Sequence, residues 1–309
     1  MTGAPAPGSV HPEVVVVGES LIDIISTVTG PVEYAGGSGL NVAFGLGRLG
    51  RATALLTVLG ADQRGQAIRQ HLDSAGVELL PGAVRLKRTS TAKATLDSWG
   101  AAHYTFDIEW NLPPVAPTFA PRVLHACSLA TFLEPGATQV RSLLAFFNGR
   151  CLITYDPNIR PGIIGDHDKA QRTFERTASL ATLVKLSDED AAWLYPGLAI
   201  GDVARHILGL GVKAVVVTAG AEGANLYSDL DHVSVPAPAV TVADTVGAGD
   251  SFMASIIASL LECPEQDFDR QQLERLGTVA AAAAAITVTR HGANPPTAAE
   301  LDEALALSV

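Results

Sequence analysis

Residues 243–252 read Ala-Asp-Thr-Val-Gly-Ala-Gly-Asp-Ser-Phe, and the interpretation of the whole chain starts from this stretch. Gly247, Ala248 and Gly249 have no bulky side chain, so their backbone N–H groups are open to a ligand. The apolar run 252–261 that follows predicts a helix with these N–H groups at its start. Unpaired donors and the helix dipole attract an anion there, most often a phosphate. The turn at 247–250 is therefore a candidate anion hole.

Asp250 lies in this same turn, where a carboxylate would repel a phosphate. Catalysis gives a reason for its presence, because a base there can take a proton from a hydroxyl that attacks phosphorus. An ordinary helix N-cap is the alternative, and the stretch alone leaves both interpretations open. Its spacing matches neither the Walker phosphate loop nor the dinucleotide fingerprint.

A second glycine-rich turn lies in the N-terminal third of the chain. Residues 36–50 read Gly-Gly-Ser-Gly-Leu-Asn-Val-Ala-Phe-Gly-Leu-Gly-Arg-Leu-Gly, a turn followed by a helix that closes on a glycine. Together the two stretches resemble the two signatures of the ribokinase-type (PfkB-type) carbohydrate kinases. The resemblance implies one carbohydrate kinase domain over residues 1–309, with the ribokinase-like three-layer α/β/α fold, a mostly parallel central sheet and a small β-sheet lid. It also implies ATP-dependent phosphorylation of a sugar hydroxyl, with Asp250 as the base.

Hydrophobic patterns also predict an α/β fold. Short apolar runs without alternation, typical of strands covered on both faces, alternate with helical stretches. This order implies right-handed βαβ crossovers and a mostly parallel sheet between helical layers. The predicted strands are 14–17, 54–59, 123–129, 151–155, 183–186 and 214–218, and the helices between them include 66–75, 138–147, 169–180 and 203–210.

Residues 85–110 break this order with strand alternation on both sides of a predicted turn at 98–101. The pattern predicts a β-hairpin. The resemblance implies that it forms the family's lid over the sugar, with 28–35 as a second contributor. A hairpin insertion without that role is the alternative. Tyr104 and Phe106 point to one face of their strand, which assigns Phe106 to the sugar. Lids in this family are free flaps or dimer contacts, so a homodimer through the lid is one expectation.

Further motifs follow predicted strands, at the edge where open α/β sheets bind ligands. Asp23 follows the first strand, and the resemblance assigns it to sugar hydroxyls, because a carboxylate can accept two hydrogen bonds. Asp-Pro-Asn-Ile-Arg-Pro at 156–161 offers Arg160, whose planar fork matches phosphate oxygens. Caps or solvated turns are the alternatives for Asp23, Asn41 and Arg160. The expected substrate-binding residues are Asp23, Gly36, Gly37, Asn41, Phe106, Asn158 and Arg160.

The resemblance also assigns a nucleotide site and its ions. Ser187 and Asp190 replace the Asn and Glu of the family motif that organises magnesium, and the shorter Asp190 implies contact through water. The acidic first turn of a helix is the alternative for Asp190. Asp244 borders the monovalent-cation site of many relatives. The implied cofactors are Mg²⁺ with ATP, and K⁺. The expected nucleotide-binding residues are Lys185, Ser187, Thr218, Gly220, Gly223, Thr245, Gly247 and Gly249.

Composition narrows the classes of partner. A net charge of −11 opposes binding to nucleic acid or an acidic membrane, which leaves a small-molecule sugar and ATP as the expected partners. Three separated cysteines without a Cys-x-x-Cys motif indicate reduced thiols in a cytoplasmic protein. Residues 1–12 lack the features of a signal peptide and are expected to be a loose tail. The longest apolar run, 279–288, is too short to span a bilayer.

Fructose is the expected sugar, phosphorylated at its primary hydroxyl to fructose 6-phosphate. The motif at 156–161 resembles those of fructokinases and 2-keto-3-deoxygluconate kinases, and Gly-Ala-Asn-Pro-Pro-Thr at 292–297 resembles the fructokinase ending. The stretch 104–110 has no Lys or Arg to bind an acid sugar. A 2-keto-3-deoxygluconate kinase, or another PfkB-type sugar or nucleoside kinase, is the alternative. A non-catalytic sugar- or nucleotide-binding regulator is the alternative from another class, and Asp250 argues against it.

Overall fold

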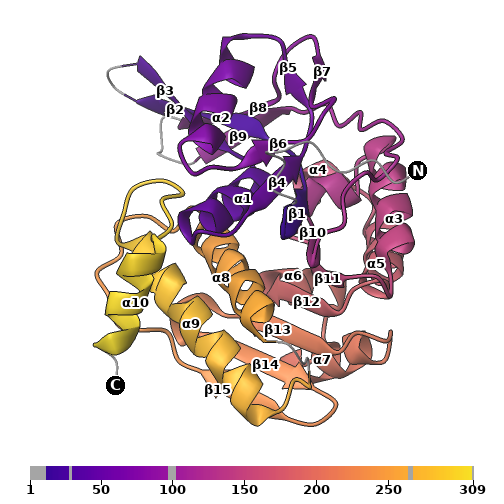
Figure 1. The fold of residues 1–309 in the computed structure, drawn as a ribbon, viewed down its shortest axis with the longest axis vertical. Helices are drawn as coiled ribbons and strands as arrows, with labels where there is room; N and C mark the ends of the chain where they lie inside the picture. The colour runs from indigo at the N-terminus through magenta and orange to yellow at the C-terminus, as the bar shows by residue number, and fades with distance from the viewer. Residues whose placement is uncertain (1–11, 28–29, 97–101, 264–266, 308–309) are drawn as a thin grey trace, which may run out of the picture.

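The computed structural model describes residues 12–27, 30–96, 102–263 and 267–307, and a nine-stranded sheet is its central element (Figure 1). Its strands are β1 (Val14–Val17), β4 (Thr53–Leu56), β6 (Glu78–Leu79), β10 (Val123–Cys127), β11 (Leu152–Asp156), β12 (Leu183–Ser187), β13 (Ala214–Thr218), β14 (Ala224–Ser228) and β15 (His232–Val235). Their order is β15-β14-β13-β12-β11-β10-β1-β4-β6. The strands pair in parallel except at β14 and β15, which are antiparallel. The mostly parallel sheet expected from the sequence is confirmed.

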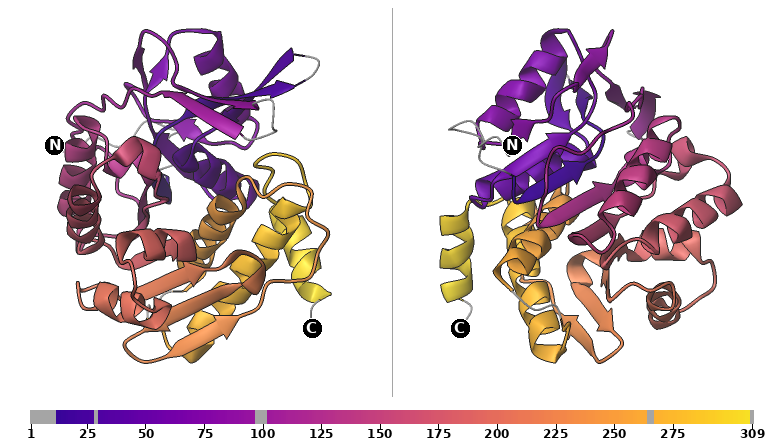
Figure 2. Two further views of the ribbon diagram at one scale, coloured as in Figure 1. Left: turned by 180° about the vertical axis from the view of Figure 1, so that it is seen from behind. Right: turned by 45° about the vertical axis from the view of Figure 1, so that its right-hand side comes forward.

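Helices cover both faces of this sheet and give the molecule three layers (Figures 1 and 2). On β1, Val14 and Val16 belong to one hydrophobic core and Val15 and Val17 to the other, which is why this strand shows no polar alternation. The first core is covered by α1 (Ser38–Arg48), α2 (Gln63–Asp73), α8 (Ala248–Glu262) and α9 (Arg270–Val288), with α10 (Ala298–Ala306) against α9. The second is covered by α3 (Gly136–Phe147), α4 (Pro161–Ile164), α5 (His167–Ala178), α6 (Asp188–Leu194) and α7 (Ile200–Leu208).

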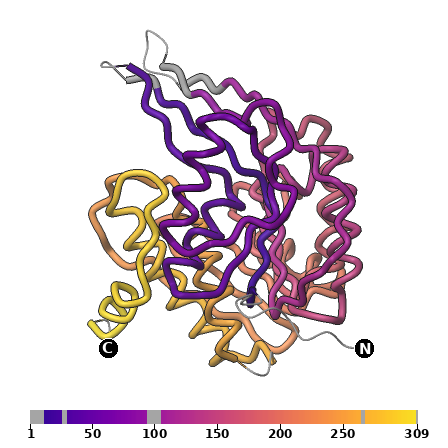
Figure 3. Tube along the Cα trace, turned by 45° about the horizontal axis from the view of Figure 1, so that its top comes forward, coloured from indigo at the N-terminus to yellow at the C-terminus, as the bar shows by residue number. Residues whose placement is uncertain are grey.

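A separate four-stranded sheet extends from one end of the molecule (Figure 3). Its strands are β2 (Leu21–Thr27), β3 (Gly30–Gly36), β8 (Thr91–Leu96) and β9 (Ala102–Asp107), in the order β3-β2-β8-β9. Strands β8 and β9 form the hairpin predicted within 85–110. The predicted turn at 98–101 and nearly all of the predicted tail 1–12 lie outside the described residues.

Several elements differ from the expectation. The strand predicted at 54–59 is two strands, β4 in the large sheet and β5 (Leu59–Gly60), which pairs with β7 (Val84–Leu86) in a small sheet of its own. The edge strand β15 alternates exposed and buried residues, so it lacks the apolar run by which the parallel strands were predicted. Strand β2 was not predicted either, because its first four residues interrupt apolar positions with Asp23.

Helix α8 begins at Ala248, four residues before the predicted start at 252. Gly247 serves as its N-cap in a left-handed conformation, with φ 78°, which favours glycine. Asp250 therefore lies in the first turn of the helix. The predicted apolar run 279–288 is the second half of α9. Among the described residues, every helix is too short or too polar to cross a membrane.

Candidate active site

A cleft of about 1560 Å³ opens at the carboxyl ends of the parallel strands, where open α/β sheets bind ligands. One wall is the four-stranded sheet, through β2, β3 and Phe106 of β9. The floor comes from the first turns of α1 and α8. Residues 158–163 after β11 and residues 291–294 between α9 and α10 close the sides. The cleft thus joins the two glycine-rich turns that the sequence pattern singled out.

Asp250 is held at the floor of the cleft by two residues of α1. The Ser38 hydroxyl donates to its Oδ1 across 2.7 Å, and the Asn41 amide donates to its Oδ2 across 2.8 Å. The whole residue is 9% exposed. Each of its oxygens therefore has a fixed donor, and the remaining lone pairs define the direction in which the carboxylate can accept a proton.

The turn before Asp250 presents backbone donors to the cleft. A Cβ at Gly247 would lie 2.6 Å from that of Ala293, so this position has no room for a side chain. The Ala248 N–H already donates to the Thr245 carbonyl across 3.3 Å, which removes one donor from the predicted anion hole. The N–H groups of Gly249 and Asp250 have no acceptor within the part of the chain that the structure describes. Orphan donors at a helix N-terminus are suited to an anion.

A buried ion pair lies next to this turn. Lys185, on β12, donates from Nζ to Asp156 Oδ2, on β11, across 2.9 Å, and both side chains are nearly inaccessible. A Cβ on Gly249 would lie 3.0 Å from Lys185 Nζ, so the ammonium group faces the start of α8. Burial lowers the pKa of Lys185, but the neighbouring carboxylates, Asp156 foremost, outweigh it and raise the pKa. Lys185 therefore stays protonated beside the turn, in an ion pair with Asp156.

Asp23, on β2, leads the group of residues expected to bind the sugar. Burial raises its pKa to about 6, against the opposing effect of the nearby Arg160 guanidinium. A Cβ on Gly36 would overlap the Asp23 carboxylate, so glycine at position 36 leaves room for this carboxylate. Asn158 has φ 37°, and its N–H donates to Asp156 Oδ1 across 3.2 Å. The structure brings the following predicted residues to the cleft: Asp23, Gly36, Gly37, Asn41, Phe106, Asn158, Arg160, Lys185, Asp244, Thr245, Gly247, Gly249 and Asp250.

Ser187 and Asp190 are placed differently from the expectation. They form a capping box at the start of α6, in which Asp190 N donates to Ser187 Oγ and Ser187 N donates to Asp190 Oδ2. Asp190 Oδ1 also accepts from the Ile159 N–H across 2.9 Å. Both carboxylate oxygens of Asp190 therefore accept hydrogen bonds from backbone N–H groups, which favours the helix-cap alternative over a magnesium role. Thr218, Gly220 and Gly223, at the end of β13, also lie outside the cleft walls that the described residues form.

Asp244 is also occupied by backbone donors. Its Oδ2 accepts from the Gly292 N–H across 2.9 Å and its Oδ1 from the Val246 N–H across 3.0 Å. Burial alone would raise its pKa, but these donors outweigh burial and lower it. The side chain therefore shapes the turn before Gly247. Over the described ranges, no three His, Cys, Asp or Glu side chains group closely enough to hold a metal ion.

Ser38 and Glu19 at the cleft, and Asp156 next to Lys185, were not among the residues predicted from the sequence. Ser38 stands three positions before Asn41, and this spacing on a helix puts both side chains on one face, so the signal was available. Asp156 lies in the quoted motif but was not assigned to the site. Glu19, 4% exposed, accepts from the Ala130 N–H across 3.1 Å, and burial raises its pKa. Its partner is distant in sequence, so no local pattern could show the contact.

Comparison with known proteins points to one family. Residues 11–300 match the model of the pfkB family carbohydrate kinases. A fructokinase of Rhizobium leguminosarum bv. trifolii is 37% identical over 260 residues, which cover 79% of this chain and 78% of that protein. A double-mutant fructokinase of Vibrio cholerae O395, solved with fructose, ADP and a potassium ion, is 25% identical with a TM-score of 0.83 and covers 96% of this chain and 100% of its own. The Vibrio cholerae O395 fructokinase solved with fructose, ADP and a calcium ion is 26% identical with a TM-score of 0.83, covering 94% and 98%.

Proposed function

The chain belongs to the pfkB family of carbohydrate kinases, and we propose that it transfers the terminal phosphoryl group of ATP to D-fructose, forming fructose 6-phosphate. The observation that carries the proposal is the Asp250 carboxylate, fixed by Ser38 and Asn41 in the first turn of α8. A base is needed where a hydroxyl attacks phosphorus, and orphan N–H donors are needed where the phosphate charge lies. The floor of the cleft offers both within one helical turn.

The reaction follows from these positions. Asp250 accepts the proton of the primary hydroxyl of fructose while the sugar oxygen forms a bond to the terminal phosphorus and the bond to ADP breaks. The N–H groups of Gly249 and Asp250, together with the Lys185 ammonium group, lie where they can stabilise the negative charge on the transferred group. Asp23, Asn41 and Asn158 supply hydroxyl partners that orient the sugar, and Arg160 adds a cation at the same wall.

The four-stranded sheet contributes Asp23 and Glu33 to the cleft, and its own described residues there include neither Lys nor Arg. Two arginines from other elements line the cleft beside them, and each faces one of these carboxylates: Arg64 pairs with Glu33, and Arg160 opposes the rise in the pKa of Asp23. A sugar carboxylate would have to compete with Glu33 and Asp23 for these arginines, whereas fructose needs only hydroxyl partners. The relatives named fructokinase support the same choice.

Magnesium is the divalent ion that we propose for this enzyme, and it accompanies ATP. The protein offers few ligands for it, because the oxygens of Asp190 and Asp244 already accept backbone hydrogen bonds. Mg²⁺ keeps much of its water shell and binds readily through substrate phosphates, which suits such a site. The bound ion would offset phosphate charge. A monovalent cation near Asp244 is a secondary proposal, since one related structure was solved with a potassium ion.

Two further proposals concern the cellular compartment and the oligomeric state of the enzyme. We place the enzyme in the cytoplasm, where ATP is available, and its three cysteines are free thiols in keeping with that compartment. A homodimer through the four-stranded sheet remains a prediction. Ile25, Val32 and Tyr34 are exposed apolar side chains on this sheet, and two of them, Ile25 and Tyr34, line the cleft.

A coupled assay of ADP release tests the activity and its substrate together. With fructose, 2-keto-3-deoxygluconate, ribose and adenosine in parallel, we expect kcat/KM for fructose to exceed the others by at least ~10-fold, about 1.4 kcal/mol of differential transition-state binding. Preference for another substrate would overturn the fructose assignment and leave a kinase. Sugar binding by calorimetry with no turnover on any of the four would instead favour a non-catalytic regulator.

A further inference from the structure

The connection between α9 and α10 forms the side of the cleft next to the start of α8. Four of its residues, His291, Gly292, Ala293 and Asn294, line the cleft together with Val246 and Gly247. The residues proposed for the sugar come from other elements, namely β2, α1, β9 and the segment after β11. The connection instead borders Val246 and Gly247, which belong to the turn proposed to receive the phosphates.

On its inner side, the connection is fitted closely to the turn before Asp250. The Gly292 N–H donates to Asp244 Oδ2 across 2.9 Å. The Ala293 methyl group occupies the space that a side chain at Gly247 would need. A shift of the connection by even an ångström would therefore open a gap beside Gly247 and release the Asp244 carboxylate.

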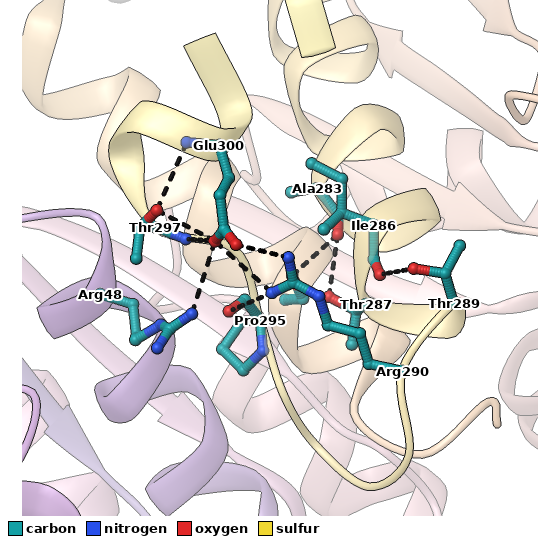
Figure 4. A network of polar contacts seen from close by, with 10 residues as sticks. Arg48, Ala283, Ile286, Thr287, Thr289, Arg290, Pro295, Thr297 and Glu300 are labelled. Carbon is teal, nitrogen blue, oxygen red and sulfur yellow. Dashed lines mark hydrogen bonds and ion pairs between the residues drawn. The ribbon is translucent and has the colours of Figure 1, made fainter. Parts of the chain in front are cut away.

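On its outer side, a single carboxylate holds both ends of the connection (Figure 4). Glu300, in the first turn of α10, accepts from Arg290 across 2.6 Å at the beginning of the connection. At the other end it accepts from the Thr297 N–H across 2.7 Å and from the Thr297 hydroxyl across 2.9 Å. Arg48, at the end of α1, reaches the same carboxylate at 3.5 Å. Arg290 also donates to the Pro295 carbonyl across 3.4 Å within the connection.

We infer that Glu300 is a positioning residue for the phosphate donor: by tying Arg290 to Thr297 it holds Gly292 and Ala293 against the turn that receives the ATP phosphates. The inference rests on the proposed kinase function, and it concerns a side chain that does not itself line the cleft. It predicts that loss of this carboxylate weakens nucleotide binding and leaves sugar binding nearly unchanged.

The Glu300 carboxylate stays ionised between pH 6 and 9. The Thr297 N–H, followed by the Arg290 guanidinium, lowers the pKa of Glu300 to about 2. The positioning effect is therefore constant between pH 6 and 9, which separates it from any effect of Asp23, whose pKa is about 6.

Glu300→Gln and Arg290→Gln test the inference in the full-length enzyme, with Glu262→Gln as the matched control. Glu262 also joins two arginines, Arg51 and Arg275, and its side chain is 46% exposed against 40% for Glu300, but it lies at the far end of α8 from Asp250. For Glu300→Gln and Arg290→Gln we expect the KM for ATP and the calorimetric Kd for ADP without sugar each to rise at least fivefold. The KM for fructose should stay within twofold, and Glu262→Gln should change none of the three.

Further variants distinguish positioning from general stability. Arg290→Lys keeps a charge near Glu300 and should recover part of the lost ADP affinity. The double variant Arg290→Gln/Glu300→Gln should weaken ADP binding no more than either single variant, because both remove the same link. Unchanged ADP affinity in Glu300→Gln and Arg290→Gln, with or without a lower melting temperature, would overturn the inference, as would equal rises in both KM values. An inactive wild-type protein would contradict the proposed function instead, while the ADP measurement would still test the role of Glu300.

Discussion

Asn41 donates a hydrogen bond to Asp250 across 2.8 Å, and this contact joins the first turn of α1 to the first turn of α8. The two residues are 209 positions apart. Ser38 adds a second bond from the same face of α1, so the direction of the Asp250 carboxylate is set by an element other than its own helix. The position of the proposed base thus depends on the packing of α1 as well as on the Gly247 turn.

Asp250→Asn tests the proposed base directly. The amide keeps the size of the side chain and removes its ability to accept a proton, so kcat should fall by roughly 10²-fold or more. The Kd for ADP, measured by calorimetry, should change much less. Asp166→Asn is the control, because Asp166 also lies at the start of a helix but outside the cleft, and its kcat should equal that of the wild type. Near-wild-type turnover by Asp250→Asn would exclude the assignment.

Much of the fold could be predicted from the sequence because its parallel strands are buried on both faces. Such strands are continuous apolar runs, and β1 and β13 begin and end where those runs do. Strands β2 and β15 lack that signal, since both carry polar residues within the strand and β15 lies at the sheet edge. Strand β15 pairs with β14, which precedes it directly in the chain, and β2 pairs with β3, which follows it, so both hairpins are local. Only the pairing of β2 with β8 joins distant segments, which a local pattern does not reveal.

The candidate site was predicted best where the backbone itself shapes the ligand position. The glycine turns at 36–39 and 247–249 could be identified because close approach requires small residues. By contrast, Asp190 was assigned to magnesium on the motif alone, while its geometry as a helix cap depends on Ile159 and Ser187. The Lys185–Asp156 pair was missed as a pair, because it joins the ends of two neighbouring strands and has no sequence spacing of its own.

Asp23 should give the sugar affinity a dependence on pH. Its pKa is raised from 3.8 to about 6 by burial, so the carboxylate becomes protonated as the pH falls through 6 and can no longer accept two hydrogen bonds from the sugar. We expect the KM for fructose to rise below pH 6 while the KM for ATP changes little. Equal KM values for fructose at pH 5 and pH 7.5 would contradict the assignment.

The same carboxylate should destabilise the sugar-free protein. Because its pKa is higher in the folded state than in the unfolded state, its contribution to stability is present at low pH and is lost as the pH rises through about 6. Asp23→Asn should therefore raise the free energy of unfolding at pH 7.5 by roughly 1–3 kcal/mol, with little gain at pH 4. Urea unfolding at the two pH values measures the difference, and an equal change at both would exclude titration of Asp23 as its cause.

Phe106 should act on the sugar and not on the stability of the protein. Its side chain is 40% exposed and faces the cleft from the four-stranded sheet. If this sheet closes over the sugar, the ring excludes water from the reaction. Phe106→Ala should raise the KM for fructose several-fold and, with fructose present, increase the ratio of ATP hydrolysis to fructose phosphorylation. Phe146→Ala is the control, with 41% exposure on α3, away from the cleft. A lower melting temperature with an unchanged KM for fructose would assign Phe106 a structural role alone.

Gly39 should be intolerant of any side chain, because α1 approaches the end of β1 at this point. A Cβ on Gly39 would lie 2.5 Å from the Gly18 Cα, and backbone on both sides limits relaxation. Gly39→Ala should lower the free energy of unfolding by about 1–3 kcal/mol or more. Gly201→Ala, also in a helix but facing open space, should raise it by roughly 0.5–1 kcal/mol. Urea unfolding of both variants is the measurement, and a stable Gly39→Ala protein would contradict the close approach of α1 to β1.

The magnesium requirement should depend on ATP rather than on protein carboxylates. Excess EDTA should abolish fructose phosphorylation and added Mg²⁺ should restore it, because Mg²⁺ binds readily through substrate phosphates and offsets the charge of the transferred phosphoryl group. Asp190→Asn provides the discriminating variant. If Asp190 caps α6, as its bonds to Ser187 and Ile159 indicate, its loss should lower the stability by roughly 0.5–2 kcal/mol and leave the Mg²⁺ concentration for half-maximal rate within twofold. A tenfold increase in the Mg²⁺ concentration for half-maximal rate, without loss of stability, would instead indicate that Asp190 contributes to magnesium binding. Activity that persists in excess chelator would contradict the magnesium proposal itself.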